Sequence, residues 1–256
     1  MAKSSYRLFD NLSKGRTSLN IFLRIPHPWT AEMISHQDFD SITLDLQHSL
    51  IGREATALML AAMQKDVYPM ARLSWNDPAQ IMYALDVGVK GVICPMINSR
   101  QDAEAFVSAC FYPPKGIRSY GSIRANLPPR ETYMKDYDED ILTIAQIETR
   151  AGLENVEAIA STPHLSGLYL GPYDLSIDLG YSKLADFSNP DFMKQVEKVL
   201  LAAKKHKLLT CVHAFGEEDA ARLASIGFNI ITPMDETSMM MQAIREKLTR
   251  VKSMMR

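Results

Sequence analysis

Short runs of β-branched and aliphatic residues alternate with longer helix-like segments along nearly the whole chain. Eight such runs are expected to be strands: Leu19–Arg24, Ser41–Leu46, Tyr68–Leu73, Gly91–Cys94, Leu142–Ile147, Gly167–Leu170, Leu208–His213 and Phe228–Ile231. Apolar residues at helical spacing fill the segments Arg53–Met63, Pro78–Leu85, Gln101–Cys110, Gly152–Ala160, Asp191–Lys205 and Glu217–Ser225. This alternation predicts an α/β fold of the (β/α)₈ TIM-barrel type.

A doubly wound open sheet is the competing interpretation of the same alternation. Such a sheet commonly binds a dinucleotide through a glycine-rich turn after its first strand. Here the first run is followed by Ile25-Pro-His-Pro28, which contains no glycine, so we expect no nucleotide cofactor. No shift in composition divides the chain, and we expect residues 1–256 to form one barrel domain.

Composition excludes several kinds of partner. The net charge of −2, from 28 Lys and Arg against 30 Asp and Glu, gives no basic surface for nucleic acid. Charged residues interrupt the apolar residues near the amino terminus, and no segment has the roughly 20 apolar residues of a membrane span. Three widely separated cysteines fit neither a disulfide framework nor a zinc site, which favours a reducing cytoplasm.

Two segments depart from a minimal barrel. The connection from Tyr112 to Asp140 is long and rich in Gly, Pro and Arg, so we expect a structured loop over the active face or a subunit contact; a solvated excursion is the alternative. The last segment, Thr237–Met255, is expected to be a helix with one apolar stripe, formed by Met240, Ile244, Leu248, Val251 and Met255. That stripe suits either the core or a partner subunit.

Polar residues stand at the ends of most of the expected strands. They are Asp45 and His48, Arg72, Gln146 and Glu148, Gly171 to Asp174, His213 and Asp235. In a barrel the carboxyl ends of the strands meet at one face, which is where catalytic groups lie. Because charges are costly to bury alone, we expect these side chains to share one polar cavity.

Glu148 and Asp174 follow adjacent strands and offer hard oxygen ligands. Two carboxylates suit a divalent cation such as Mg²⁺ or Mn²⁺, with the remaining positions left to water and a bidentate substrate. This pattern is typical of metal-assisted catalysis. The alternative is that each carboxylate pairs with an arginine or lysine at the same end of the barrel.

His48 is the first candidate for a general base, with Asp45 three residues earlier orienting its ring. A single histidine can also be purely structural; His27 and His213, on the same face, are second candidates. Arg72 offers a rigid fork for a carboxylate or an enolate oxygen, unless it forms an ion pair with one of the metal carboxylates.

Two kinds of chemistry are disfavoured. No lysine ends an expected strand, so a Schiff-base mechanism is not expected. The turns after the last two strands, Ala214–Glu218 and Thr232–Glu236, are acidic and poor in glycine, so they do not form a phosphate cradle.

The same motifs resemble the HpcH/HpaI family of metal-dependent, class II 2-oxo acid aldolases over nearly the whole chain. The matching segments are Phe39–His48, Ala71–Pro78, Cys94–Met96, Tyr112–Arg118, Gln146–Arg150, and Gly171–Ser176 with Leu179-Gly180. The resemblance implies a TIM barrel assembled as a homohexamer, a trimer of dimers, with the last helix exchanged between neighbours.

The resemblance also implies roles for individual residues. Glu148 and Asp174 look like the ligands of a Mg²⁺, Mn²⁺ or Co²⁺ ion, Arg72 like the residue at the enolate oxygen, and His48 with Asp45 like the base dyad. Gln146 and the backbone N–H groups around Gly171 and Tyr173 are expected to hold the 2-oxo acid. Asp86 falls where some members extend an acid into a neighbouring site.

The implied reaction is reversible cleavage of a 4-hydroxy-2-oxo acid into pyruvate and an aldehyde, through a pyruvate enolate. Many members read Asp-Gly-Glu-His where this chain has Asp45-Leu-Gln-His48, and Gln47 should lower the proton affinity of the base. Tyr173 replaces a residue that is usually small. Two alternatives therefore stay open: a condensing or decarboxylating enzyme acting on oxaloacetate, like macrophomate synthase or a citrate-forming relative, and a non-catalytic sensor of 2-oxo acids.

Overall fold

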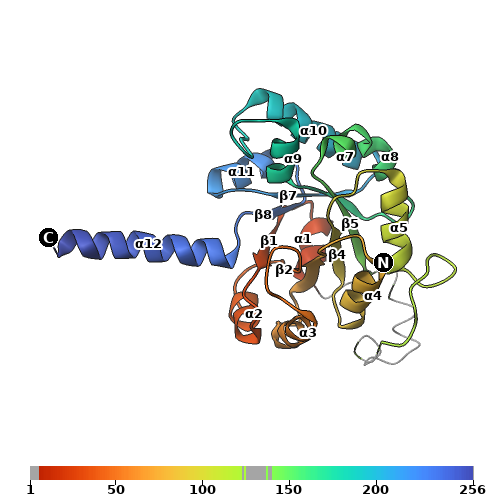
Figure 1. Ribbon diagram of the computed structural model, residues 1–256, viewed down its shortest axis with the longest axis horizontal. Coiled ribbons are helices and arrows are strands. Elements are labelled where there is room, and N and C mark those ends of the chain that lie inside the picture. Colours follow the sequence, from red (N-terminus) through yellow and green to blue (C-terminus); the bar gives the residue numbers. More distant parts are fainter. Residues whose placement is uncertain (1–5, 123, 125–136, 138–139, 256) are drawn as a thin grey trace.

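The computed structural model describes residues 6–122, 124, 137 and 140–255, and its strands close into a barrel. The strands are β1 (Ser18–Leu23), β2 (Ser41–Asp45), β3 (Tyr68–Arg72), β4 (Gly91–Cys94), β5 (Leu142–Ile147), β6 (Gly167–Leu170), β7 (Leu209–His213) and β8 (Ile230–Thr232). Each is parallel to its neighbour in the chain, and β8 closes the ring by pairing with β1 (Figure 1). The predicted TIM barrel is confirmed.

Helices follow the strands and surround the barrel (Figure 1). They are α1 (Arg7–Ser13), α2 (Pro28–Ser35), α3 (Arg53–Ala62), α4 (Pro78–Asp86), α5 (Arg100–Cys110), α7 (Arg150–Glu154), α8 (Val156–Ala160), α9 (Pro172–Leu179), α10 (Pro190–Lys205), α11 (Glu217–Ile226) and α12 (Glu236–Met254). The sequence analysis did not foresee α1, α2 and α9. The single helix expected at Gly152–Ala160 is two helices, α7 and α8, which meet at Asn155.

Side-chain caps begin several of these helices. Asp77, Ser99 and Asn189 each accept a hydrogen bond from a backbone N–H in the first turn of the helix that follows. Pro78 and Pro190 occupy the first helical position, where a missing N–H costs nothing. These local signals explain why those two helices start within one residue of the predicted positions.

The interior of the barrel is closed at the end where the strands begin. Leu8 of α1 is fully buried and packs with the side chains of Phe22, Tyr68 and Ile93, which point inward. The ring of Phe9 lies edge-on to Tyr68, the first residue of β3, with centroids 5.2 Å apart. Because α1 covers this end, the carboxyl ends of the strands form the open mouth of the barrel.

The connection between α5 and β5 does not lie over that mouth in its described part. Arg118 Nη2 lies 2.6 Å from Asp86 Oδ1 at the end of α4, and Ser122 donates to the Asp86 carbonyl. Asp140 pairs at 2.8 Å with Lys90, just before β4 begins. The described part of this connection therefore does not lie over the active face: α5 runs back along β4, so the chain leaves α5 at the end of the barrel where the strands begin. The other expectation, a subunit contact, stays a prediction. Residues 123, 125–136 and 138–139 lie outside the described residues.

The last helix, α12, extends away from the barrel (Figure 1). The expected apolar stripe is present but does not enter the core of its own barrel. Its members Met240, Ile244, Leu248 and Val251 are 47 to 52% exposed. The alternative that these apolar side chains pack in the core of their own barrel is therefore excluded.

Among the described residues, none of the helices combines the length and apolar character needed to cross a bilayer.

Candidate active site

A cavity of about 580 Å³ opens at the carboxyl ends of the strands. Its polar lining comes from side chains far apart in the sequence, among them Arg24, His48, Arg72, Gln146, Asp174 and His213. The expectation that polar strand-end residues share one cavity is confirmed for five of these and for Asp235, and Arg24 is an addition. It is not met by Asp45 and Glu148, which are buried and are not among the lining residues. Closure of the barrel brings them together.

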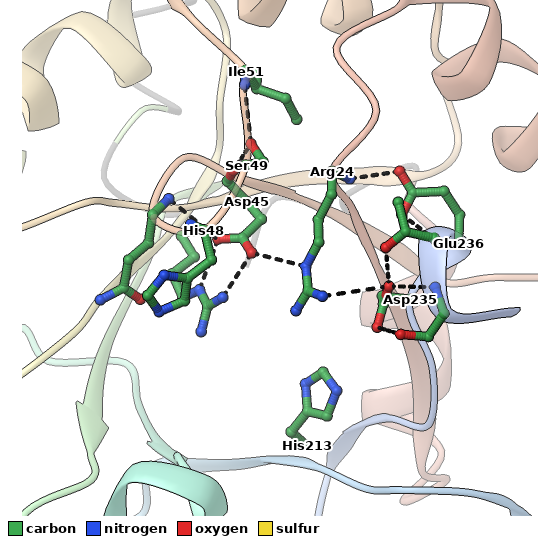
Figure 2. Close-up of polar contacts among 12 residues, drawn as sticks. Arg24, Asp45, His48, Ser49, Ile51, His213, Asp235 and Glu236 are labelled. Atoms are coloured by element: carbon green, nitrogen blue, oxygen red, sulfur yellow. Dashed lines mark hydrogen bonds and ion pairs between the residues drawn. The ribbon is translucent and has the colours of Figure 1, made fainter. Parts of the chain in front are cut away.

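Asp45, the last residue of β2, is the electrostatic centre of one side of this cavity. Its fully buried carboxylate accepts hydrogen bonds from Arg72 Nε at 3.0 Å and Nη2 at 2.7 Å, and from Arg24 Nε at 3.2 Å (Figure 2). Burial alone would raise the pKa of Asp45, but the hydrogen bonds and charges of these arginines outweigh it and hold that pKa below its usual value. Asp45 is therefore ionised and fixes both guanidinium groups.

Arg72 is held with its fork toward Asp45 and its plane near an aromatic ring. The guanidinium carbon lies 4.9 Å from the ring centroid of Phe22. Arg72 therefore pairs with Asp45 and not with a metal carboxylate, which settles the alternative raised for it. Its Nη1 makes no hydrogen bond to any described residue, and this side chain lines the cavity. That nitrogen is available to a ligand.

The expected hydrogen bond between Asp45 and the ring of His48 is not formed among the described residues, so this part of the prediction was wrong. Asp45 Oδ1 accepts instead from the backbone N–H groups of Gln47 and His48, both at 3.2 Å (Figure 2). Ser49 donates its hydroxyl to the Asp45 carbonyl and accepts from the N–H of Ile51. Asp45 thus positions His48 through the backbone of the turn, and the His48 side chain lines the cavity.

Glu148 lies one residue beyond β5 and is 2% exposed. Its Oε1 accepts the N–H of Met96 at 2.8 Å, and its Oε2 accepts the amide of Gln146. Burial raises the pKa of Glu148, and the negative charge of nearby Asp174 raises it further. A buried carboxylate with a second carboxylate nearby is a suitable place for a cation, which would stabilise the ionised form of Glu148.

Gly171 allows the turn between β6 and α9 to approach Glu148 closely. A Cβ at this position would lie 2.7 Å from both Cβ and Oε2 of Glu148 and 2.9 Å from Nε2 of Gln146. This turn places Asp174 in the first turn of α9. The Gly171 N–H, expected to bind substrate, is instead bonded to the Ile147 carbonyl at 3.0 Å, because it continues the pairing of β5 with β6.

The N–H of Tyr173, in the first turn of α9, has no hydrogen-bond partner among the described residues. It is the remaining backbone donor of the expected pair. The Tyr173 ring is 46% exposed and lies 4.1 Å from the ring of Phe215, between centroids. These two rings form an aromatic wall of the cavity.

The residues around Glu148 suit a hard divalent cation whose shell is completed by a ligand. The described residues contain no cluster of three or more His, Cys, Asp or Glu that could enclose a metal. Glu148 and Asp174 supply carboxylate oxygens, and the Oε1 atom of Gln146 is buried without a hydrogen-bond partner among the described residues. An incomplete oxygen donor set of this kind leaves room for water and a chelating substrate.

Sequence reasoning missed Arg24 as a site residue. It follows β1 directly and bridges Asp45 to Asp235, whose Oδ1 lies 3.5 Å from Arg24 Nη1 (Figure 2). The available signal was its place at a strand end, the same signal that singled out Arg72.

The two second-rank histidines differ in their surroundings. His213 Nδ1 lies 3.5 Å from the Tyr169 hydroxyl, and burial with the charge of Arg72 lowers the pKa of His213 to about 4. This ring is neutral at physiological pH. His27 caps α2 by accepting the N–H of Trp29, which is a structural role.

A parallel barrel whose mouth combines two close carboxylates, a fixed arginine and an accessible histidine defines an enzyme of the (β/α)₈ class. Residues 19–246 match the family model HpcH/HpaI aldolase/citrate lyase, and the chain belongs to this family. It is thus a carbon–carbon lyase of the aldolase type. The family is one of metal-dependent aldolases, so a divalent cation belongs to its chemistry.

Curated relatives match over nearly their whole length. A hydroxypyruvate/pyruvate aldolase from Rhizorhabdus wittichii is 32% identical over 246 residues, covering 94% of this chain and 97% of the relative. A 4-hydroxy-2-oxo-heptane-1,7-dioate aldolase from Escherichia coli is 27% identical over 236 residues, covering 91% and 89%.

Solved structures agree with the fold. A family protein from Burkholderia cenocepacia superposes with a TM-score of 0.86 at 26% identity, covering 93% of this chain and 95% of the other. The citrate synthase SbnG (24% identity, covering 97% and 98%) and macrophomate synthase (23%, covering 98% and 92%) also reach 0.86, and at these identities they show the fold alone.

Proposed function

We propose that this protein is a divalent-metal-dependent pyruvate aldolase, which reversibly cleaves a 4-hydroxy-2-oxo acid into pyruvate and an aldehyde. The observation that carries the proposal is that buried Glu148 and nearby Asp174 lie at the same mouth as Arg72, which lines the cavity and whose Nη1 makes no hydrogen bond to a described residue. The relatives named as pyruvate and 4-hydroxy-2-oxo acid aldolases support the substrate class.

Glu148 and Asp174 are proposed to hold Mg²⁺, Mn²⁺ or Co²⁺, which when bound polarises the keto group of the 2-oxo acid. The Nε2 group of Gln146, which has a second N–H beside the one given to Glu148, and the N–H of Tyr173 would donate to the carboxylate and keto oxygens. Arg72 would place Nη1 at the oxygen that becomes negative when the C3–C4 bond breaks, because Asp45 fixes its other two nitrogens.

His48 is proposed to take the proton of the 4-hydroxyl in cleavage and to return it in the reverse direction. Loss of this proton lets the C3–C4 electron pair move onto the pyruvate half as the aldehyde departs. Asp45 contributes to this step by fixing the turn that carries His48 and by holding Arg72. Charge on the enolate oxygen develops only as the bond breaks, so Arg72 favours the transition state over the ground state.

We further propose that the whole chain, residues 1–256, acts as one aldolase domain in a homo-oligomer, a hexamer built as a trimer of dimers. The half-exposed apolar stripe of α12 supports exchange of this helix with a neighbour, because a neighbour would cover it. The three cysteines are free and buried, which suits the cytoplasm.

Exchange of the pyruvate methyl protons into D₂O, followed by NMR, tests the proposal without knowledge of the aldehyde. We expect exchange that requires Mg²⁺ or Mn²⁺. We also expect His48→Ala to lower it by about 10²- to 10⁴-fold, because in the absence of an aldehyde the same ring is proposed to take a methyl proton as pyruvate forms its enolate. His36→Ala is the matched control, because that ring lies at the end of α2 and bonds Gln64. Absence of exchange with every divalent ion tried contradicts the proposal and favours a 2-oxo acid sensor.

Oxaloacetate provides the second arm of the same experiment. Rapid consumption of oxaloacetate without any aldehyde, together with slow cleavage of 4-hydroxy-2-oxo acids, would contradict the aldolase proposal and favour a condensing or decarboxylating enzyme. We expect cleavage of 4-hydroxy-2-oxo acids to be faster than consumption of oxaloacetate without an aldehyde.

A further inference from the structure

Met96 has an unusual backbone conformation beside the proposed metal site. It lies two residues beyond the end of β4, and its φ of 56° falls in the left-handed region. Residues other than glycine rarely adopt this region, because their Cβ then lies too close to a backbone oxygen. A residue held there costs folding free energy, and such residues are often found where the backbone serves a site.

The end of a helix does not account for this conformation. Three other non-glycine residues of the described part of the chain have a positive φ: His164, Ala185 and Lys207. Lys207 comes directly after His206, the C-cap of α10, and helices commonly end in a left-handed residue at this position. Met96 follows a strand, so its conformation needs another explanation.

The left-handed turn directs the N–H of Met96 at Glu148. This N–H donates to Oε1 of Glu148 at 2.8 Å, while the amide of Gln146 donates to Oε2. The buried carboxylate is therefore held by a donor on each oxygen. Hydrogen bonds to a carboxylate favour its ionised form, which is the form that binds a cation.

The neighbours of Met96 hold the turn in place on both sides. Before it, Cys94 pairs with β5 in the barrel. After it, the N–H of Ile97 donates to the carbonyl of Gln146 at 3.3 Å, and the Asn98 side chain accepts the hydroxyl of Thr149. The loop is thus attached to β5 immediately before and after Glu148, so the unfavourable φ of Met96 is imposed by its surroundings.

The side chain of Met96 has no comparable role. It is partly exposed and is not among the residues that line the cavity. A thioether is also a soft donor, which does not suit a hard divalent cation. The contact that matters to Glu148 is therefore made by the backbone.

We propose that Met96 is a positioning residue, whose left-handed backbone holds Glu148 in the orientation that binds the divalent cation. The inference rests on the proposed aldolase function. It adds a residue that acts through the proposed metal ligand and touches neither the metal nor the substrate.

The test uses substitutions that separate the backbone conformation of Met96 from its side chain. The Kd for Mn²⁺ is measured from the electron paramagnetic resonance of the free ion. Met96→Val introduces a β-branched residue, which resists a positive φ. We expect it to raise the Kd by about 10- to 100-fold, as loss of a group that orients a metal ligand does.

Two further variants at the same position keep the conformation accessible. Met96→Gly adopts a positive φ freely, and Met96→Leu is unbranched at Cβ like methionine, so we expect both to bind Mn²⁺ within about threefold of the wild-type protein. If the side chain acted by packing, the order would be reversed: glycine would bind most weakly and valine would be tolerated.

Lys207→Val is the matched control. Lys207 has nearly the same φ, 59°, but is exposed and precedes β7, at the end of the barrel where the strands begin. The same strain introduced there should lower the midpoint of urea denaturation and leave the Kd for Mn²⁺ unchanged. Circular dichroism establishes that each variant is folded.

The possible outcomes separate this inference from the proposed function. If Met96→Val binds Mn²⁺ as tightly as the wild-type protein, or Met96→Gly weakens binding by about tenfold or more, the role of Met96 is overturned. The aldolase function then stands on pyruvate exchange by the wild-type protein. If Met96→Val does not fold, the Met96→Gly result decides alone. If the wild-type protein binds no Mn²⁺ and catalyses no exchange, the aldolase function fails and this inference fails with it.

Discussion

Gly171 sets how closely the turn before α9 approaches Glu148, and replacing it by alanine tests the architecture of the proposed metal site. The added methyl would lie 2.7 Å from Cβ and Oε2 of Glu148, about 0.7 Å inside the 3.4 Å at which ordinary contact begins. The backbone of β5 fixes that Cβ, and the N–H of Met96 holds the carboxylate at 2.8 Å, so the clash cannot be relieved by a simple rotation. Either Glu148 or the first turn of α9, with Asp174, must move.

Two magnitudes follow for Gly171→Ala. Overpacking of this kind costs about 1–3 kcal/mol of folding free energy. Displacement of groups that orient metal ligands typically lowers metal affinity by about 10- to 100-fold. We expect both effects, because the methyl group would push on a proposed ligand and on Gln146, which bonds it.

Urea denaturation measures the first effect, and titration with Mn²⁺, followed by the electron paramagnetic resonance of the free ion, measures the second. Gly52→Ala is the matched control: a Cβ there meets nothing within 4 Å, and its φ of −87° suits any residue. If Gly171→Ala binds Mn²⁺ and catalyses pyruvate exchange within twofold of the wild-type protein, the account of this turn and of Glu148 as a ligand is wrong.

Three further predictions concern charge. Asp45→Asn should lower the free energy of unfolding by about 3 kcal/mol, because it leaves Arg72 without its buried partner. Asp10→Asn, at an exposed pair, should leave it nearly unchanged in the same urea titrations. Glu148→Gln should abolish Mn²⁺ binding in a calorimetric titration but leave the far-ultraviolet circular dichroism unchanged; tight Mn²⁺ binding by this variant would contradict the assignment. The folded pKa of His213, about 4, lies below its unfolded value of 6.5, so its contribution to stability is present above pH 6.5 and is lost as the pH falls toward 4. At a partly exposed cavity wall this is worth about 2 kcal/mol, and His213→Leu should lose that much less stability than the wild-type protein between pH 7 and 4.

The sequence was sufficient to predict the barrel, because strand and helix periodicities are local properties. Each of the eight expected strands lies within two residues of its position in the structure. The short helices α1, α2 and α9 were missed because so few turns carry little periodic signal. Asn155 has backbone angles that interrupt an otherwise helical pattern, and its residue type does not announce the break between α7 and α8.

The sequence predicted which residues lie at the candidate site better than it predicted the hydrogen bonds between them. Strand-end position selected His48, Arg72 and Gln146, and all three line one cavity. The partner of the Asp45 carboxylate could not be derived, because three residues of separation on a tight turn bring a backbone N–H, not a ring, to its oxygen. Arg24 was missed because its importance depends on contacts that only the folded barrel makes.

The start of α12 is also part of the mouth of the barrel. Asp235 caps this helix on Ser238 and pairs with Arg24, and Glu236 holds the Arg24 backbone. The helix has 19 residues, so its far end lies about 28 Å from this turn. An inhibitor directed at the first turn would thus displace Arg24 at the cavity, whereas a probe attached near Met254 would report on whether another subunit covers the helix without disturbing the cavity.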